Sequence, residues 1–276
     1  MRKARVLFVS QEITPYLDET HIGKIARRLP QAIQERGKEI RTFMPKYGNI
    51  NERRHQLHEV IRLSGMNIVI NNADHPLIIK VASIPTARMQ VYFIDNDDYF
   101  QRKSVLTDKA TGKYFDDNDE RTVFFNRGVI ETVKKLGWAP DVIHCHGWFT
   151  GLIPLYIKKA FSEDPLFADT KIVFTIYDEE FTKSLNKKIV DKAMIDGVTK
   201  KELKHLEDAS YVNLMKLAID FADGISFGSE KIHEDLIKYA KKSGKPILEF
   251  KGEAEYADAY NEFYDLVLED SEVLAD

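Results

Sequence analysis

The chain alternates short, continuous apolar runs with longer amphipathic stretches, and this alternation limits the folds that it can adopt. The run "ARVLFVS" precedes "IGKIARRLPQAIQERGKEI", in which Ile22, Ile25 and Leu29 recur at helical spacing. Gly37 ends that helix, and a second run, "IRTFMP", follows it. Pro30 predicts a kink or a new start within the helix. A strand, a helix and a strand in this order form a right-handed unit with parallel strands.

The same alternation continues to the end of the chain. We expect further strands at "DVIHCH", "KIVFTIY", "GISFGS" and "KPILEF", with helices between them and a helix over 116–136. Residues 57–95 change to a strand-like period and predict a small antiparallel insertion, while 178–207 are polar and predict a surface excursion. A stripe of aromatic residues predicts that a closing helix over 253–268 docks on the domain. The sequence therefore predicts a single domain over 1–276, a doubly wound α/β fold with a mostly parallel, Rossmann-like sheet.

Composition excludes several classes of function. With 40 basic and 44 acidic residues the net charge is −4, so a nucleic-acid partner is not expected. Cys145 is the only cysteine, which rules out an intrachain disulfide and suits a reducing, cytoplasmic location. The apolar run at the N-terminus breaks at Gln11 and Glu12 without a cleavage site, so it is interpreted as a buried strand and not as a signal peptide. No stretch approaches the length needed to cross a membrane.

The loop "DETHIGK", residues 18–24, falls between the first strand and the first helix, at the carboxyl edge of the predicted sheet. Loops at that place usually bind phosphates or sugars through glycines and a lysine. This loop offers two carboxylates, His21 and the single glycine Gly23. It is therefore a candidate site with unusual chemistry for its position.

The stretch "DVIHCHGW", residues 141–148, carries the sharpest cluster of candidate residues. Alternate side chains of a strand share a face, so His144 and His146 are expected to point the same way at the carboxyl end of a strand. They suit a contact to sugar hydroxyls or phosphate, or a metal site, for which two histidines are too few ligands. The alternative is that either histidine is a hydrogen-bonded core residue.

Three other stretches have both a functional and a structural interpretation. The acids of "DDNDER", 116–121, either present carboxylates to a ligand or cap a solvated helix start. Those of "YDEEF", 177–181, either serve acid–base chemistry or lie in a solvent-facing loop. Trp148 and Phe149 either stack on a ligand or belong to the core. No nucleophile triad, dinucleotide fingerprint or Walker loop is present.

Four stretches resemble the N-terminal half of bacterial glycogen synthases and plant starch synthases. "VLFVSQEITPY" resembles that family's "VLFVASEVAPF", and "LPQAIQERGKEIRTFMPKYGNI" resembles "LPKALAKRGHDVRVVLPRY". "DNDERTVFFNRGVIETVKKLGWAPDVIHCHGWFTGLIPLYIK" is similar to "DNAERFAFFSRAALE…PDVVHAHDWHTALLPLYLK", and "NLMKLAIDFADGISFGSE" to the segment that ends this half. The match covers roughly residues 4–230.

The resemblance implies one half of a GT-B glycosyltransferase, in which two Rossmann-like domains face each other. In that family the N-terminal domain holds an α-1,4-glucan acceptor and the C-terminal domain most of the ADP-glucose donor, without a metal or other cofactor. The resemblance implies candidate substrate-binding residues at His21, Gly23, Asp117, His144, His146, Gly147, Trp148, Thr150 and Tyr177.

The first group of departures from the family pattern lies in the loop after the first strand. The family has "KTGGLGDV" where this chain has "DETHIGKI". Asp18 replaces a lysine expected near the nucleotide phosphates, and Thr20 and His21 replace a glycine pair. A reversed charge at a phosphate site is electrostatically unfavourable.

The second group lies at the ends of later strands. In the family's "HDWH", Gly147 stands for the aspartate and Phe149 for the second histidine, which contacts the transferred glucose. Tyr177 and Asp178 replace the family's "HN", while the "DN" pair is kept, with its aspartate at Asp117.

The chain is also about half as long as a complete synthase, and the donor-binding second domain is missing from it. One hypothesis is a glucosyltransferase subunit that depends on a protein partner for its donor half. A second, which the altered loop favours, is a pseudoenzyme that binds α-glucan or a true synthase, alone or as a homo-oligomer. A third is a different small-molecule enzyme that uses the three histidines and the acids of 178–180.

Overall fold

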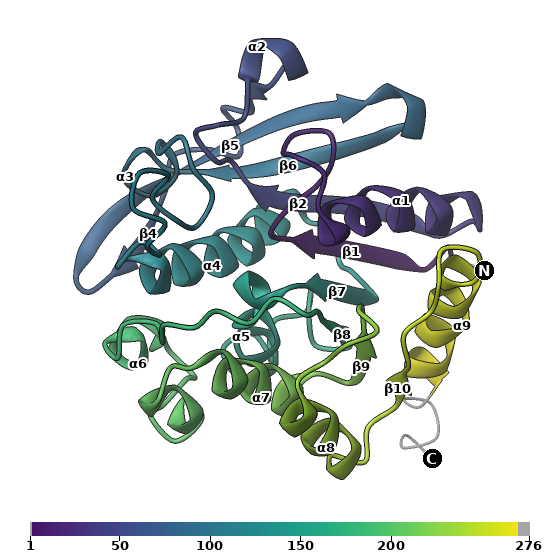
Figure 1. Cartoon of the computed structure of the whole chain (residues 1–276). Helices are drawn as coiled ribbons and strands as arrows, with labels where there is room; N and C mark the ends of the chain where they lie inside the picture. Colours follow the sequence, from purple (N-terminus) through teal and green to yellow (C-terminus); the bar gives the residue numbers. More distant parts are fainter. Residues whose placement is uncertain (1, 270–276) are drawn as a thin grey trace.

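A mostly parallel sheet of ten strands organises residues 2–269, the part of the chain that the computed structural model describes (Figure 1). The strand order is β10, β9, β8, β7, β1, β2, β6, β5, β3, and β4 pairs with β5. Neighbouring strands from β10 to β6 are parallel, which confirms the predicted sheet. The strands are β1 Arg5–Ser10, β2 Glu39–Pro45, β3 His58–Glu59, β4 Met66–Ile70, β5 Ala73–Ile84, β6 Met89–Asp95, β7 Val142–His146, β8 Lys171–Ile176, β9 Gly224–Phe227 and β10 Ile247–Leu248.

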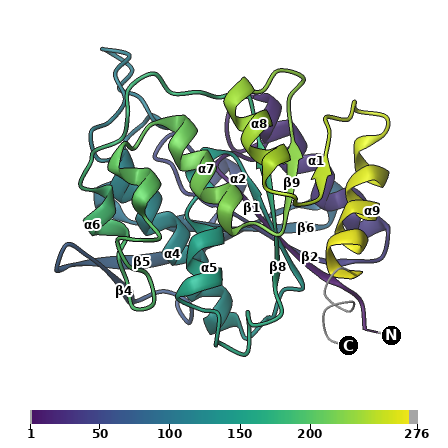
Figure 2. The same ribbon diagram turned by 90° about the horizontal axis from the view of Figure 1, so that it is seen from below.

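Helices cover both faces of the sheet, as a doubly wound fold requires (Figures 1 and 2). α1 and α9 pack on one face, and α4, α5 and α7 on the other. The α-helices are α1 His21–Glu35, α2 Glu52–His55, α3 Asp97–Phe100, α4 Asn118–Leu136, α5 Ile153–Lys159, α6 Ile189–Ala193, α7 Tyr211–Phe221, α8 Glu234–Lys242 and α9 Tyr256–Glu269. Three 3-10 turns are η1 Pro85–Ala87, η2 Trp148–Thr150 and η3 Lys204–Glu207. None of the helices in this described part is both long and apolar enough to cross a membrane.

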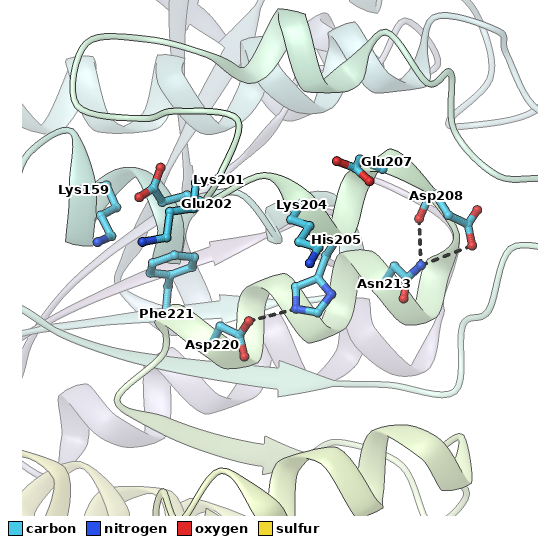
Figure 3. Close-up of a pocket in the computed structure, with 10 residues that line it drawn as sticks. All are labelled: Lys159, Lys201, Glu202, Lys204, His205, Glu207, Asp208, Asn213, Asp220 and Phe221. Carbon is cyan, nitrogen blue, oxygen red and sulfur yellow. Dashed lines mark hydrogen bonds and ion pairs between the residues drawn. The ribbon is translucent and has the colours of Figure 1, made fainter.

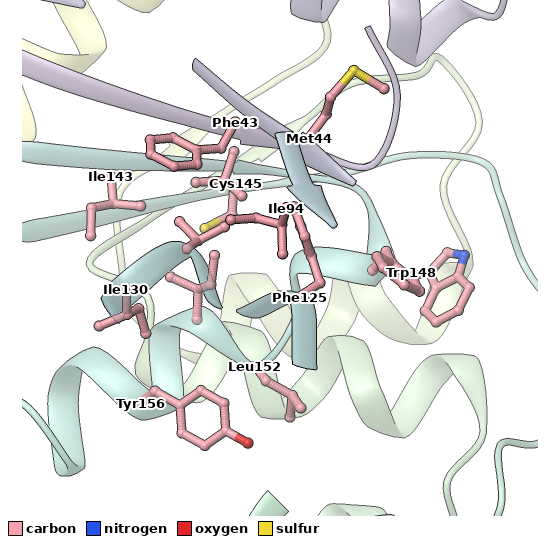
Figure 4. Close-up of a cluster of buried hydrophobic side chains, with 14 of the residues drawn as sticks. Phe43, Met44, Ile94, Phe125, Ile130, Ile143, Cys145, Trp148, Leu152 and Tyr156 are labelled. Atoms are coloured by element: carbon pink, nitrogen blue, oxygen red, sulfur yellow. The ribbon is translucent and has the colours of Figure 1, made fainter. Parts of the chain in front are cut away.

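Burial on both faces explains why the central strands are continuous apolar runs. In β1, Val6 and Phe8 point to the α1 and α9 side, whereas Leu7 and Val9 point to the α4 and α5 side. Figure 4 shows the second of these cores, where Phe125 of α4 and Leu152 lie against strand residues. α1 runs without interruption through Pro30, so the predicted new start at that residue is wrong.

The predicted antiparallel insertion is smaller than residues 57–95. β3, β4 and β5 are antiparallel, but β6 lies parallel to β2 and belongs to the main sheet. The sequence of β6 also has the continuous apolar character of a central strand, with burial at six of its seven positions. The antiparallel part therefore ends at Ile84, and β6 joins it to the parallel sheet.

Residues 178–207 contribute side chains to the buried core. Their apolar side chains are buried in the main core, among them Phe181, Ile189 and Leu206. Lys192 of α6 is 4% exposed and forms ion pairs with Asp119 (2.6 Å) and Glu120 (2.7 Å) at the start of α4. The segment is thus a packed layer over α4, and the prediction of a surface excursion is wrong.

The closing helix docks as its aromatic stripe predicts. Tyr256, Tyr260, Phe263 and Tyr264 of α9 are buried against β1, β7 and β8. The view from below places α9 beside α1, across the sheet from α5 and α7 (Figure 2). This helix completes the apolar cover of one sheet face.

Candidate functional site

A pocket lies where the strand order reverses, which is the place where open α/β sheets bind ligands. The chain proceeds from β1 to β2 on one side and returns to β7 on the other, so the loops after β1 and β7 separate there. The pocket has a volume of about 370 Å³. Its lining residues come from the loops after β1, β7, β8 and β9 and before α4: Gln11, Glu12, Thr20, His21, Ile22, Leu106, Tyr114, Trp148, Tyr177, Asp178, Glu179, Glu180 and Ser229.

The loop "DETHIGK" starts α1 and forms one wall of this pocket. Thr20 caps the helix, because its hydroxyl accepts a hydrogen bond from the Gly23 N–H (2.9 Å). The same hydroxyl donates to Glu12 (2.5 Å). His21 donates from Nε2 to the carbonyl of Gly228 (2.6 Å) and lines the pocket. The backbone N–H of Gly23 is therefore already bonded within the protein.

The two histidines of β7 share a face, as predicted, with ring centroids 3.9 Å apart. His144 is fully buried, and its two ring nitrogens bond Tyr264 and Thr175, each at 2.6 Å. It is a core residue beneath α9 and does not reach the pocket. His146 is also buried and bonds the hydroxyl of Tyr177 (2.8 Å), which lines the pocket.

Burial keeps both histidines neutral. It lowers the pKa of His146 to about 3 and that of His144 well below its usual value, with a further contribution from His146 in the second case. In the described part of the chain, Nε2 of His146 has no hydrogen-bond partner. The pair therefore supports Tyr177 from below and carries no charge near neutral pH.

Three residues, Gly147, Gln11 and Glu179, pack against one another beneath the pocket. Gly147 has a φ of +84°, and a Cβ atom there would lie 2.6 Å from Oε1 of Gln11 and 2.9 Å from Oε1 of Glu179. Glu179 accepts hydrogen bonds from the Trp148 N–H and from Nε2 of Gln11, both at 2.7 Å. Oε1 of Gln11 accepts from the Phe149 N–H (3.3 Å). The sequence did not single out Gln11 or Glu12. Of the acids of "YDEEF", Asp178 and Glu180 are exposed, as the interpretation of a solvent-facing loop expects, whereas Glu179 is partly buried and hydrogen-bonded.

Two of the remaining predicted residues, Asp117 and Thr150, lie outside the pocket, and Trp148 lies at its edge. Asp117 forms a two-pronged ion pair with Arg102 and makes no side-chain cap to α4. Thr150 is buried and donates to the Gly147 carbonyl (2.7 Å). Trp148 is 2% exposed and packs edge-on against Phe181, so the core interpretation holds although its edge lines the pocket.

Acidic side chains dominate the lining of the pocket. Its lining includes Glu12, Asp178, Glu179 and Glu180 but no lysine or arginine. Burial, and then the charge of Glu12, raises the pKa of Glu179 to about 8, against the opposing effect of its N–H donors. Burial also raises the pKa of Glu12. Such a lining suits hydroxyl groups or cations and disfavours phosphates.

A second, larger groove of about 630 Å³ lies along α7, between η3 and the end of α5 (Figure 3). Its polar groups bond one another: His205 pairs with Asp220 (2.9 Å), and Asn213 donates to the Asp208 carbonyl (2.9 Å). No strand end contributes to its lining. The pocket at the sheet edge is therefore the stronger candidate site.

Comparisons with known proteins agree with this architecture. The starch synthase catalytic domain family matches residues 5–248. The glycogen synthase of Chlorobium limicola is 34% identical over 236 residues, which are 86% of this chain and 48% of that protein. The glycogen synthase of Pelodictyon phaeoclathratiforme is 36% identical over the same shares of the two chains. The chain thus spans about half the length of these curated relatives.

A solved structure shares the fold. The catalytic domain of starch synthase IV from Arabidopsis thaliana, bound to ADP and acarbose, superposes with a TM-score of 0.72 at 17% identity. The alignment covers 90% of this chain and 51% of that one. The sheet therefore corresponds to one half of a GT-B architecture. Because the family match extends over most of the sequence, this chain belongs to the starch synthase catalytic domain family.

Proposed function

We propose that this chain is a glycogen or starch synthase-type domain that binds α-glucan at the sheet-edge pocket and does not hold the diphosphate of ADP-glucose. The observation that carries the proposal is the lining of the pocket, which within the described part of the chain has four carboxyl groups and no lysine or arginine. Carboxyl groups accept hydrogen bonds from sugar hydroxyls, whereas they repel phosphate oxygens.

The loop after β1 supports the same proposal. Asp18 stands where the family pattern has a lysine, and the N–H of Gly23 is bonded to Thr20. The solved starch synthase domain is bound to two ligands, the nucleotide ADP and acarbose. On our proposal, this chain keeps the fold and the carbohydrate-binding role and lacks the nucleotide-binding role. We place it in the cytoplasm, because its lone Cys145 is buried and unpaired.

The test measures transfer and binding in the same tubes. The purified chain is incubated with glycogen and labelled ADP-glucose, and both incorporation and co-sedimentation are measured. We expect co-sedimentation without incorporation. Incorporation above the blank would contradict the proposal and would favour a glucosyltransferase, while the absence of both would remove the carbohydrate-binding role.

A matched pair of variants tests whether glycogen binds at this pocket. Tyr114 lines the pocket and is partly exposed, and Tyr239 of α8 is partly exposed and remote from it. We expect Tyr114→Ala to weaken glycogen binding by about tenfold through the loss of ring contact with sugar. Tyr239→Ala is expected to leave it unchanged, and equal effects of the two variants would place the binding elsewhere.

A further inference from the structure

The space above Gly147 is filled by side chains from two other loops. A side chain at position 147 would collide with Gln11 and Glu179. Its Cβ atom would lie 2.6 Å from Oε1 of Gln11 and 2.9 Å from Oε1 of Glu179, and Cβ atoms normally keep a greater distance from their neighbours. Position 147 and Glu179 therefore compete for one volume. In this chain the loops after β1 and β8 supply the side chains that occupy it, Gln11 and Glu179.

Glu179 is held in one orientation at the wall of the pocket. Its Oε1 accepts from the Trp148 N–H and its Oε2 from the side-chain amide of Gln11. It is partly exposed to the pocket, and it forms no ion pair within the described part of the chain. A carboxyl oxygen has about two lone pairs, so each oxygen keeps the capacity to accept one more hydrogen bond.

We propose that Glu179 is a ligand-binding residue of this pocket, where its carboxyl group binds a hydroxyl of a carbohydrate ligand from the space that a side chain at position 147 would fill. This inference rests on the proposed carbohydrate-binding function and names the residue that makes the contact. A hydroxyl both donates and accepts a hydrogen bond. A carboxyl group that keeps a proton near neutral pH offers the same two capacities, and the pKa of Glu179, raised by burial to about 8, supplies that proton.

Other titratable groups face Glu179 from the surrounding elements and set the background of any pH profile. They are Glu12 after β1, His21 of α1, Tyr47 after β2, Tyr114 before α4, Tyr211 of α7, and Tyr177, Asp178 and Glu180 after β8. All of them remain in a Glu179 variant. If the substitution of Glu179 changes how the binding affinity depends on pH, that change is therefore assigned to Glu179.

The experiment measures the affinity of maltoheptaose for the full chain by calorimetry, from about pH 6 to about pH 9. We expect wild-type affinity to fall as pH rises above about 8, because Glu179 then loses its proton and desolvation of the charged group opposes binding. Glu179→Gln has no proton to lose, so its profile should be flat. Its amide NH2 would face one of the two N–H donors that the carboxyl group accepts from, so its affinity near neutral pH should lie between those of wild type and Glu179→Ala. Glu179→Ala should bind about tenfold more weakly.

Glu207→Gln is the matched control, since it removes an exposed carboxylate in the groove along α7. It should reproduce the wild-type affinity and profile. If wild type binds maltoheptaose and a folded Glu179→Ala binds equally well, Glu179 has no role in ligand binding, although the proposed function stands. If Glu179→Ala does not fold, identical profiles of wild type and Glu179→Gln overturn the inference. No binding by wild type overturns both proposals.

Discussion

At the level of single residues, Glu179 determines much of the chemistry of the pocket. Position 147 carries aspartate in the motif that this chain resembles, and here it is glycine. The structure shows that a carboxyl group still reaches this space, from residue 179. The pocket therefore keeps a carboxyl group, that of Glu179, although the motif has lost its aspartate.

The raised pKa of Glu179 predicts a pH dependence of stability. The unfolded carboxyl has a pKa near 4.5 and the folded one about 8. Between these values only the folded state keeps the proton, so the free energy of unfolding falls as pH rises, by up to about 1.4 kcal/mol per pH unit. In Glu179→Gln this pH-dependent contribution to the free energy of unfolding is absent. Urea unfolding from about pH 5 to about pH 9 should show that the difference between wild type and variant changes with pH, and parallel curves would contradict the assignment.

At the level of elements, the ion pairs of Lys192 with Asp119 and Glu120 hold α6 on α4. Asp119 is completely buried, and Lys192 is nearly so. Lys192→Ala leaves the Asp119 carboxyl buried without its cation and should reduce the free energy of unfolding by about 3–5 kcal/mol. Lys192→Met combined with Asp119→Leu removes the cation and the completely buried carboxyl group and should reduce it much less, because the carboxyl group that then loses its cation, Glu120, is partly exposed. Urea unfolding of the two variants measures this, and equal losses would show that packing, not charge, holds α6.

Sequence patterns predicted the elements with long apolar periodicity and missed those with mixed composition. β1 and β8 are buried on both faces, and their largely apolar runs indicate parallel strands. α6 is short and contains a lysine, and nothing local indicates that Lys192 is buried. Its burial depends on acids about seventy residues earlier in the chain.

At the level of the whole molecule, α9 covers the apolar face formed by Val6, Phe8 and Val142. It is also bonded to the sheet through Tyr264 and His144 (2.6 Å). A chain that ends at residue 252 should expose this face and unfold without a cooperative transition. Binding of the dye ANS and near-ultraviolet circular dichroism measure this.

The conservative control for that prediction is Tyr264→Phe. It keeps the packing of α9 and leaves a nitrogen of His144 without its partner, which should cost about 1–3 kcal/mol with cooperative unfolding retained. If the shortened chain unfolds as cooperatively as Tyr264→Phe, α9 is not part of the folding unit.

The sequence by itself determined the doubly wound fold, the docking stripe of α9 and the family of this protein. Each rests on a pattern that is local or continuous along the chain, because a strand or helix repeats its burial with a fixed period. The tertiary structure decided which residues form the pocket. It placed His144 under α9, turned Glu179 inward and left Asp117 with Arg102. Beyond a strand end the backbone has no fixed period, so contacts with segments distant in sequence decide where each side chain points.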